Sequence, residues 1–600
     1  MGLLQSAYKT YCAAEQEIGK YEEGKQPLAP VSHVVMKAHI EITLDQEGMF
    51  IAAKEVDKDD EKIIIPATQK SAGRTSGHVA HPLCEQIGYL CGLDEEKYQL
   101  YVTQLEQWNA SPWSHPKLQP VLNYVKSKQL LSDLVRCGLV TLNTAGMPKD
   151  DKLLICWRIL NADSDAPPEC WRDKTLFQSF IDYYASTQNM PQGLCMVSGR
   201  VTGITDQHPQ KIVSFYDRAK IISSGDENGF TYRGRFENDW QTATVSYEVS
   251  QKAHAALSWL VANQGTPIGR RVFLCWNPNG VQLPHVNMPL RPKKSSAVFQ
   301  PSEYRQDLQR TLLGEKERLP QDTQAVIAAF DAATTGRLSV TYYNELLASD
   351  FVQRLHDWDE SCCWYYGKLG VQSPWLENIV DCAYGVQRVQ KRKPQFVTDD
   401  RVRRQQLQRM VACRINRARM PADILRRLVE RTSNPMAYDE GLWQELLFVT
   451  CAVIQKYHAP MLKEELCMEW KLDRKDPSFQ YGRLLAVMER AEADYYVKTD
   501  EKKRQTNALR SLTAFKKTPW KVFERVNEKL ESAYLNRLDK RSRNRYYRLR
   551  DEIVAILCQC CEDLNAPLNE FYLVGYSLQR NAFFESKDSN NQETTENKEE

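Results

Sequence analysis

Membrane-spanning and catalytic signatures are missing from this sequence of 600 residues. It contains no run of about 18 apolar residues, the length that a transmembrane helix requires. It also lacks the phosphate-binding loop of nucleotide hydrolases, the HExxH zinc motif and the GxSxG nucleophile turn. A long chain without such motifs is more typical of a binding subunit than of an enzyme. We therefore expect no catalytic residue, no metal and no cofactor.

A disulfide framework is also missing. The chain has 17 cysteines, an odd number, without the regular spacing of small disulfide-rich domains. Several stand in apolar surroundings, as Cys156 does in LLICW and Cys275 does in FLCW. Free buried thiols are typical of a reducing compartment, which predicts a cytoplasmic protein.

Two short arrangements of metal-binding residue types are weak candidates. His78, His81 and Cys84 follow one another at ligand spacing, but the paired CxxC arrangement of structural zinc sites is absent. His356 and Asp357 form a bare pair without the further histidines that metal phosphohydrolases need. We interpret both as structural. His356 and Asp357 are retained only in the alternative hypothesis of a stand-alone metal-dependent nuclease.

Hydrophobic periodicity changes about halfway along the chain. Apolar and polar residues alternate from Met36 to Leu44, as in a half-buried strand, and further short strands are expected between helices up to residue 290. Beyond residue 290 the strand signal nearly vanishes. Helices are expected there over 320–330, 343–354, 374–391, 401–419, 421–431 and 439–457.

The predicted fold class is therefore α+β, with a mixed α/β N-terminal domain followed by an all-helical region that ends in a small helical bundle. The expected boundaries are 1–290 for the α+β domain, 291–460 for the helical middle region and 461–584 for the bundle. Residues 585–600 are acidic and polar, and we expect them to form a disordered tail.

Two polar loops with glycines stand out in the N-terminal half. One spans 67–78; the other follows a predicted strand over 212–216 and precedes a helix that contains Val249, Leu257 and Leu260. Glycine lets a backbone approach a phosphate or a groove edge closely, and arginine or lysine supplies the opposite charge. The loop residues expected to contact a polyanion are Lys70, Ser71, Arg74, Thr75, Ser76, Asn228, Thr231, Tyr232, Arg233 and Arg235.

Two helical windows are strongly basic although the net charge of the chain is only +2. Residues 388–431 hold 14 basic and 4 acidic side chains, and residues 502–550 hold 16 basic and 4 acidic. Such windows fit a single nucleic-acid strand, but they equally fit solvated helix faces. The candidate strand-binding residues are Arg403, Arg404, Arg414, Arg417, Lys540, Arg541, Arg543, Arg545 and Arg548.

Several segments in a fixed order carry a family resemblance. They are GRTSGHVAHPLCEQIGYLCG from residue 73, ATVSYEVSQKAHAALSWL from residue 243, INRARMPADILRRLVERTSNP from residue 415 and YGRLLAVMERAE from residue 481. In this order they resemble the large subunit of the type I-C (Dvulg subtype) CRISPR Cascade complex. The passage Thr242-Ala243-Thr244 departs from the asparagine- and proline-rich pattern of that family.

The resemblance implies a non-enzymatic subunit of an RNA-guided surveillance complex. Such a subunit sits at the crRNA 5′ end, recognises the protospacer-adjacent motif in duplex DNA, aids unwinding, stabilises the R-loop and recruits the helicase-nuclease. The implied partners are crRNA, target double-stranded DNA, the backbone, crRNA-handle and small subunits, and the helicase-nuclease, with no membrane. Met461 or Met468 would be an internal start for a small subunit.

The resemblance also assigns roles to the candidate residues. The two polar loops would contact the DNA motif or the crRNA end, and the basic helices would hold the displaced strand. Two alternatives remain open: the stand-alone nuclease described above, and a generic helical RNA-binding scaffold that needs neither guide nor partner.

Overall fold

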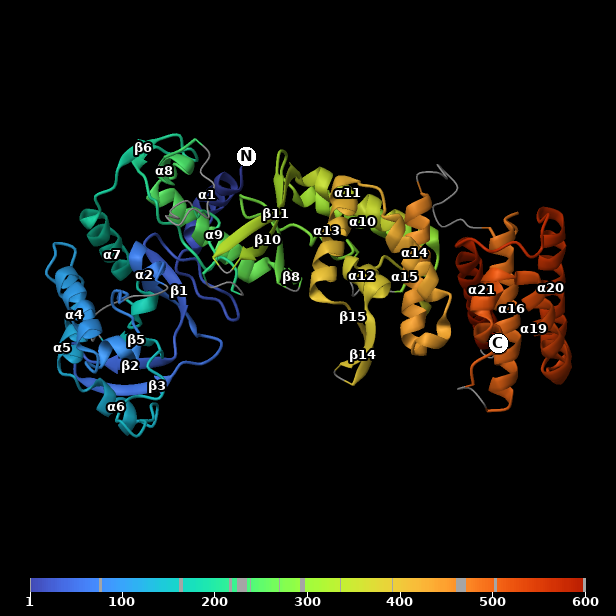
Figure 1. Ribbon diagram of the computed structural model, residues 1–600, viewed down its shortest axis with the longest axis horizontal. Helices are drawn as coiled ribbons and strands as arrows, with labels where there is room; N and C mark the ends of the chain where they lie inside the picture. Colours follow the sequence, from blue (N-terminus) through green and yellow to red (C-terminus); the bar gives the residue numbers. More distant parts are fainter. Residues whose placement is uncertain are drawn as a thin grey trace. The chain divides into compact units, whose positions relative to one another are not determined.

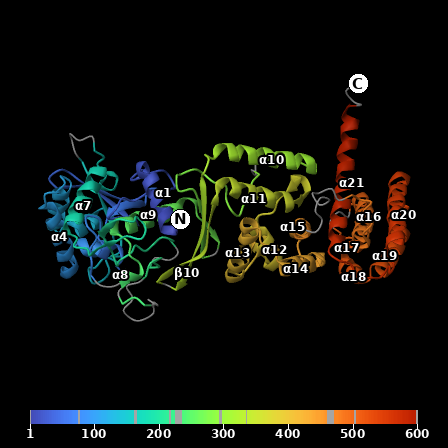
Figure 2. The same ribbon diagram turned by 90° about the horizontal axis from the view of Figure 1, so that it is seen from above.

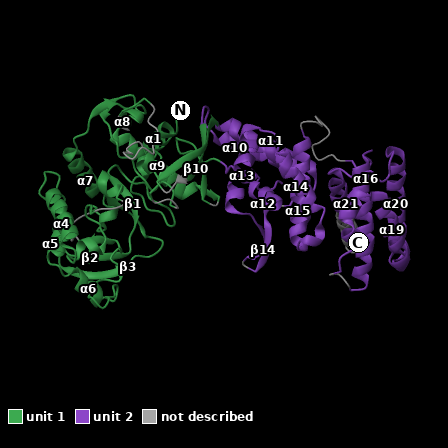
Figure 3. Cartoon of the chain, in the orientation of Figure 1, with its two compact units in different colours: residues 1–283, 324–346 green, residues 284–323, 347–600 purple. Residues whose placement is uncertain are grey.

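The chain forms two compact units, which Figure 3 distinguishes by colour. Unit 1 comprises Met1–Leu283 and Gln324–Leu346, and unit 2 comprises Pro284–Thr323 and Leu347–Glu600. The computed structural model describes residues 2–74, 78–160, 166–214, 218–223, 235–237, 239–268, 270–291, 297–334, 336–390, 392–459, 471–500 and 504–596. Small sheets lie in unit 1 and helices dominate unit 2, so the α+β fold class is confirmed (Figure 1).

A three-stranded sheet forms one part of unit 1. Strand β2 (Ile40–Leu44) pairs antiparallel with β3 (Phe50–Glu55) and parallel with β5 (Ile155–Ile159). Strands β2 and β3 form a hairpin, and the Asp45 carboxylate stabilises its turn by accepting from the Met49 amide at 2.7 Å. The strand predicted from Met36 to Leu44 is wrong as a single element. The range is divided between two strands in different sheets. Its first residues belong to β1 (His33–Lys37), which pairs with β4 (Lys62–Pro66), and its last residues form β2.

The three-stranded sheet packs on helices α4 (Glu95–Asn109), α5 (Leu118–Lys126), α6 (Leu130–Arg136) and α7 (Lys174–Thr187). The apolar stripe along α4 is buried, with Tyr101 and Trp108 fully enclosed. The Asp94 side chain caps this helix by accepting from the Lys97 amide at 3.2 Å. Trp108 and Trp157 belong to the same core.

A second sheet of unit 1 has the order β11-β10-β9-β8. Its strands are β8 (Thr266–Ile268), β9 (Arg271–Trp276), β10 (Gln324–Thr334) and β11 (Arg337–Leu347). Helices α1 (Leu3–Ala13) and α9 (Tyr247–Gln264) pack together beside it, and the Trp276 indole donates to Thr10 Oγ1 at 3.0 Å. The predicted helix 320–330 is therefore wrong. Its apolar run is a fully buried strand, which periodicity cannot distinguish from a buried helix.

The middle part of unit 2 is mostly helical, as predicted. Its helices are α10 (Pro301–Arg318), α11 (Ala348–Ser361), α12 (Leu376–Tyr384), α13 (Asp400–Asn416), α14 (Ala422–Thr432) and α15 (Glu440–His458). Helix α10 runs alongside α11 (Figure 2). Two helix predictions need correction. Residues 343–347 belong to β11, and the end of the predicted helix 374–391 is a strand, β14 (Val386–Gln390), paired with β15 (Lys393–Val397).

The C-terminal bundle contains α16 (Pro477–Lys498), α19 (Pro519–Ala533), α20 (Lys540–Cys560) and α21 (Phe571–Glu596). Helix α16 is buried along most of its length and packs against the other three. The bundle belongs to unit 2, and α21 also packs on α15. The disordered tail expected over residues 585–600 stays a prediction.

Among the residues that the structure describes, no helix combines the length and apolar character needed to cross a membrane.

Candidate nucleic-acid interface

The first polar loop begins with a short helical turn, α2 (Gln69–Ala72). Ser71 is buried and forms a capping box with Thr68, whose hydroxyl accepts from the Ser71 amide at 3.0 Å. Lys70 is exposed on the same turn, so its ammonium is available to a ligand. Thr75 and Ser76 lie outside the described residues.

Arg74, at the end of this turn, is held by protein groups. Its guanidinium forms a bidentate ion pair with Glu85 at 2.5 and 2.9 Å and donates to the Val79 carbonyl at 2.7 Å. It also lies over the Tyr89 ring at 5.0 Å. The Glu85 side chain is completely buried and also accepts from the His81 amide. These contacts favour a structural role for Arg74, which anchors the loop beside Lys70.

The second polar loop is described only in part, over residues 218–223, 235–237 and from 239 onward. Asn228, Thr231, Tyr232 and Arg233 lie outside the described residues. Arg235 is exposed, and its guanidinium lies over the neighbouring Phe236 ring at 5.4 Å.

The elements that flank this loop differ in how well the sequence predicted them. The strand expected over 212–216 is absent from its described part, since residues 212–214 form bends and a turn with Ile212 and Val213 buried. The helix expected afterwards is confirmed as α9, capped by Ser246, whose hydroxyl accepts from the Val249 amide at 3.3 Å.

The four arginines predicted on and after α13 have different surroundings. Arg414 is buried and pairs with buried Asp359 at 2.8 Å, so it stabilises the interior of unit 2. Arg403 pairs with Asp381 at 3.0 Å, and Arg404 donates to the Asp400 carbonyl at 3.2 Å.

Arg417 is the most open of the four. It ends α13 in the left-handed conformation, with φ of 54°, and its side chain is 58% exposed. Its guanidinium pairs with Asp357 at 2.9 Å. It lines a cavity in unit 2.

This cavity has a volume of about 610 Å³ and combines cations with aromatic rings. We call it the basic cleft. Its cationic side chains are Arg354, Arg414, Arg417, Arg419 and Lys456, and its aromatic side chains are Trp358 and Tyr457. Among the described residues, the Trp358 indole N–H and the Arg354 Nε have no hydrogen-bond partner although both atoms are buried. Unpartnered donors next to several cations favour an anionic ligand.

The electrostatics inside the basic cleft are dominated by positive charge. Lys456 Nζ lies 5.0 Å from the Trp358 ring centre, and burial lowers the pKa of this ammonium. The one carboxylate among the lining residues is Asp357. Burial opposes its ionisation, but nearby His356, a hydrogen bond from Gln353 at 2.8 Å and the guanidinium of Arg417 together lower its pKa to about 2.

The basic cleft draws on helices that are distant in the sequence. Arg354 and Trp358 lie on α11, and Lys456 and Tyr457 lie near the end of α15. Sequence reasoning found only its Arg414 and Arg417, because no local pattern marks a cation that another helix brings into place.

Helix α20 presents the second basic surface. Lys540, Arg541 and Arg548 are exposed and Arg543 is half-buried, and the structure shows no ion pair for these four among its described residues. We call these four side chains the α20 basic face. Arg545 instead lies over the Phe583 ring at 5.2 Å.

The two tyrosines of α20 are not open stacking platforms. Tyr546 is buried in the bundle and hydrogen-bonds Asp494. The Tyr547 ring is covered by Arg550 at 4.8 Å. A strand on the α20 basic face would therefore be held mainly by charge.

The weak metal candidates have structural partners. His356 Nδ1 lies 3.6 Å from Asp357 Oδ1, and His78 Nδ1 lies 3.2 Å from Glu96 Oε2. Within the described part of the chain, no three His, Cys, Asp or Glu side chains come together in a way that could hold a metal ion.

Comparison with known proteins identifies the family of this chain. The family model for CRISPR-associated protein (Cas_Csd1) matches residues 6–584. No curated protein matches the chain. Because the match covers both units nearly from end to end, the protein belongs to the CRISPR-associated Cas_Csd1 family.

Proposed function

We propose that this chain is the non-catalytic large subunit of a type I-C CRISPR RNA-guided surveillance complex. The observation that carries the proposal is the family match over residues 6–584. The basic cleft and the α20 basic face support it, since both offer cations suited to a nucleic-acid backbone. In this function the protein recognises the protospacer-adjacent motif, aids unwinding, stabilises the R-loop and recruits the helicase-nuclease.

In an RNA-guided complex, target recognition is divided between base pairing with the guide and contacts made by the protein. When base pairing with the guide reads the target sequence, the protein needs to recognise only a short duplex motif and the strands that open next to it. In unit 1, exposed Lys70 and Arg235 are the described loop residues suited to contact the motif or the crRNA end. Arg74 would position Lys70 through its ion pair with Glu85.

Unit 2 would hold the displaced strand. The basic cleft has room for phosphate groups between Arg417, Arg419 and Lys456, and Tyr457 offers a ring beside them. The α20 basic face would contact the strand by charge alone. Single-strand binding of this kind is strongly salt-dependent and tolerant of sequence.

The strand-binding role is tested in the assembled complex with the double variant Arg541→Glu and Arg543→Glu. We expect a shorter R-loop lifetime. We also expect a weaker salt dependence of binding: the slope of the logarithm of the binding constant against the logarithm of the salt concentration should become less steep by about 0.7 for each phosphate that the protein no longer neutralises. The matched control, Arg310→Glu with Arg318→Glu, reverses two exposed arginines of α10. Equal lifetimes and slopes in both variants would show that the α20 basic face is only solvated surface.

Motif recognition is tested separately with Lys70→Ala and with Arg233→Ala combined with Arg235→Ala. Binding of the assembled complex is compared on targets with correct and altered motifs. We expect weaker binding to the correct motif and a smaller difference between the two targets. Undiminished binding to the correct motif would show that these residues do not recognise it.

The alternatives make different predictions for the purified chain. A stand-alone nuclease would cut labelled DNA with magnesium or manganese and lose that activity in His356→Ala, and this result would overturn the proposal. A generic RNA-binding scaffold would bind RNA equally well without partner subunits. We expect no cleavage, and we expect guide RNA and partner subunits to copurify with the tagged chain.

A further inference from the structure

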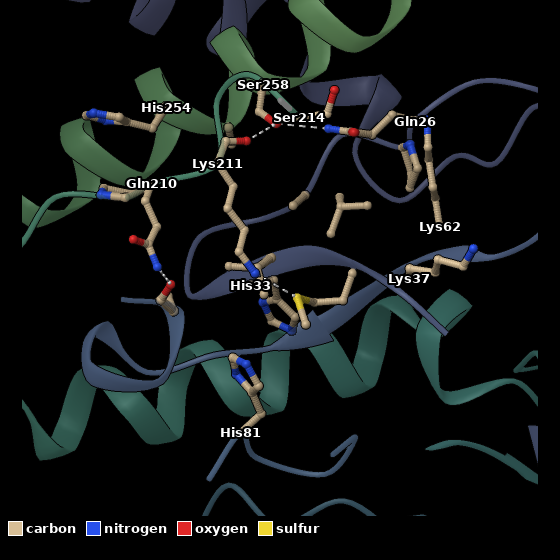
Figure 4. Close-up of a pocket in the computed structure, with 18 of the residues that line it drawn as sticks. Gln26, His33, Lys37, Lys62, His81, Gln210, Lys211, Ser214, His254 and Ser258 are labelled. Carbon is tan, nitrogen blue, oxygen red and sulfur yellow. Dashed lines mark hydrogen bonds between the residues drawn. The ribbon is translucent and has the colours of Figure 1, made fainter. Parts of the chain in front are cut away.

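Two polar side chains that line a cavity of unit 1 are engaged with protein atoms (Figure 4). The Lys211 ammonium contacts the Met36 sulfur at 3.5 Å, and the Gln210 amide donates to the Ala72 carbonyl at 3.1 Å. A hairpin of unit 2 presents the opposite case. It consists of β14 and β15, and we call it the β14–β15 arm.

The base of the β14–β15 arm is fixed to the helices of unit 2. Arg431 on α14 donates to the Gly385 carbonyl at 2.7 Å and lies over the Phe396 ring at 5.1 Å. The Thr398 hydroxyl donates to the Asp381 carboxylate on α12 at 2.7 Å. A Cβ on Gly385 would lie only 2.8 Å from the Phe396 Cβ, so glycine permits this close packing. The contacts hold both strands in one direction.

The outer part of the arm extends away from these helices (Figure 1). All residues of β14 are exposed, and Val389 is 72% exposed. Arg388, Arg392 and Lys393 are exposed, and none of them forms an ion pair within the described part of the chain. Residues 385–398 contain four basic side chains and no acidic one. The arm therefore presents uncompensated positive charge on a fixed support.

The strand register gathers polar groups on one face of the arm. Arg388 is opposite Gln395, and Gln390 is opposite Lys393. Residues that are two apart in a strand share a face, so these four side chains point to the same side. The Gln395 amide donates to the Gln390 side-chain oxygen, which keeps the two glutamines adjacent. We call these four side chains the polar face of the arm.

Another β-strand is a poor partner for this hairpin. Pro394 in β15 has no N–H to donate, and charged side chains on an edge strand oppose pairing with a further strand. Duplex DNA fits better. Its major groove, about 12 Å wide, admits a two-stranded β-ribbon, and arginine and glutamine are suited to the edges of guanine and adenine there. The phosphates on both sides of the groove complement the positive charge.

We propose that the β14–β15 arm enters the major groove of duplex DNA, with its polar face toward the base edges and Arg392 on a phosphate. The inference rests on the proposed function, because the duplex is the double-stranded part of the target. It adds a contact that is distinct from the basic cleft and from the α20 basic face. An RNA duplex does not offer this contact, since its major groove is too deep and narrow.

The contact is tested by photo-crosslinking in the assembled complex. Benzoylphenylalanine replaces Val389, and the probes are a target DNA duplex, its single strand and an RNA duplex of the same sequence. We expect adducts with the DNA duplex to be at least about fivefold more abundant than those with either other probe. Val201 is the matched control position. It is also 72% exposed, in the hairpin of β6 (Gln192–Leu194) and β7 (Val201–Gly203), and should give few adducts.

Charge reversal tests how much the contact contributes to binding. Arg388→Glu combined with Lys393→Glu should weaken binding of the assembled complex to the target duplex at least about tenfold, because two cations beside phosphates become anions. The matched control, Arg310→Glu with Arg318→Glu, reverses two exposed arginines of α10 and should bind normally. Circular dichroism of each variant confirms folding.

The outcomes distinguish this inference from the proposed function. Adducts mainly with the single strand, or mainly with a protein subunit, would overturn the groove contact. Equal affinities of the two double variants for the target duplex would also overturn it. In each of these cases the wild-type complex still binds its target, and the proposed function stands. A wild-type complex that does not bind target DNA would contradict the proposed function itself.

Discussion

Arg74 and Lys70 show how two neighbouring cations of one loop can have different tasks. Arg74 pairs with a carboxylate that is fully buried, whereas Lys70 is exposed. The same contrast separates Arg414 from Arg417 in unit 2, since the first is 1% exposed and the second is 58% exposed at the side chain. An arginine that faces a buried carboxylate stabilises the fold, and one at an open surface is available to a ligand.

The first prediction concerns the Arg74–Glu85 pair. Arg74→Ala leaves the Glu85 carboxylate buried without its main partner, so we expect a loss of about 3–5 kcal/mol in the free energy of unfolding. Lys70→Ala, at an exposed position of the same loop, should change it by less than about 0.5 kcal/mol. Urea denaturation of both variants measures the difference. Equal stabilities would contradict the structural role of Arg74.

The second prediction concerns the stability of the folded chain at low pH. Burial is the main cause that lowers the pKa of His33 and of His254 to about 4 and that of His208 to about 3. The unfolded chain binds these protons near pH 6.5, whereas the folded chain does not bind them until about pH 4. Stability should therefore be complete above pH 6.5 and fall toward pH 4, by roughly 1.4 kcal/mol per pH unit for each histidine.

Thermal unfolding between pH 7.5 and pH 4.5 measures this loss. His33→Phe keeps an aromatic ring beside Phe177 and Phe180 but cannot be protonated, so its melting temperature should fall less steeply with pH. A slope identical to that of the wild-type chain would exclude His33 as a source of the acid sensitivity.

At the scale of elements, α16 and α21 approach so closely that only glycine fits at two points. A Cβ on Gly482 would lie 1.9 Å from the Tyr572 carbonyl oxygen, and one on Gly575 would lie 2.0 Å from the Phe479 carbonyl oxygen. Each glycine thus admits the backbone of the other helix. The close packing of α16 against α21 depends on this reciprocal arrangement.

The third prediction follows from this close approach. Gly482→Ala should lower the free energy of unfolding of the bundle by about 3 kcal/mol or more, because the added methyl group meets backbone that cannot move aside. Gly314→Ala in α10 is the matched control, since its Cβ would have no neighbour within 4 Å. It should raise helix stability by about 0.5–1 kcal/mol. Similar effects in the two variants would contradict the packing described.

Elements with a local signal were predicted from the sequence, and those defined by distant partners were not. Helix α9 could be identified, since its buried residues Val249, Leu257 and Leu260 recur at helical spacing within one segment. Strand β10 could not, since its run of buried alanine, valine and isoleucine has no period. What makes it a strand is pairing with β9, which ends 48 residues before β10 begins.

The candidate nucleic-acid interface could likewise be predicted only where its signal is local in the sequence. Charge density along the chain indicated α13 and α20, because it is visible in the sequence itself. It could not show that Arg414 points inward or that Trp358 and Lys456 from two other helices complete the basic cleft.

At the scale of the whole molecule, α10 is an insertion in a β-hairpin of unit 1. Strands β9 and β10 are antiparallel neighbours, with Trp276 opposite Val326. The turn Asn277–Gly280 is already formed, and the Asn277 amide donates to the Gln324 carbonyl at 2.7 Å. The chain therefore leaves unit 1 after the turn that follows β9, and it returns to unit 1 as β10, which pairs with β9.

The fourth prediction uses this geometry. A shortened chain that joins Gly280 directly to Thr323 and stops at Leu346 should fold cooperatively, because it closes the hairpin and keeps the four-stranded sheet. A chain that stops at Leu283 lacks β10 and β11, with the buried Val326 and Phe330, and should be largely unfolded. Circular dichroism melting distinguishes the two. Comparable melts would show that β10 is dispensable.

The insertion also limits how members of this family can be recombined. The chain passes between the units at three places, after residues 283, 323 and 346. A chimaera joined once at residue 283 would place β10 and β11 of one parent against β9 of the other, so its sheet would be assembled from mismatched halves. Exchanging a whole unit requires all three junctions to be moved together, and a cut at any one of them leaves at least one fragment with parts of both units.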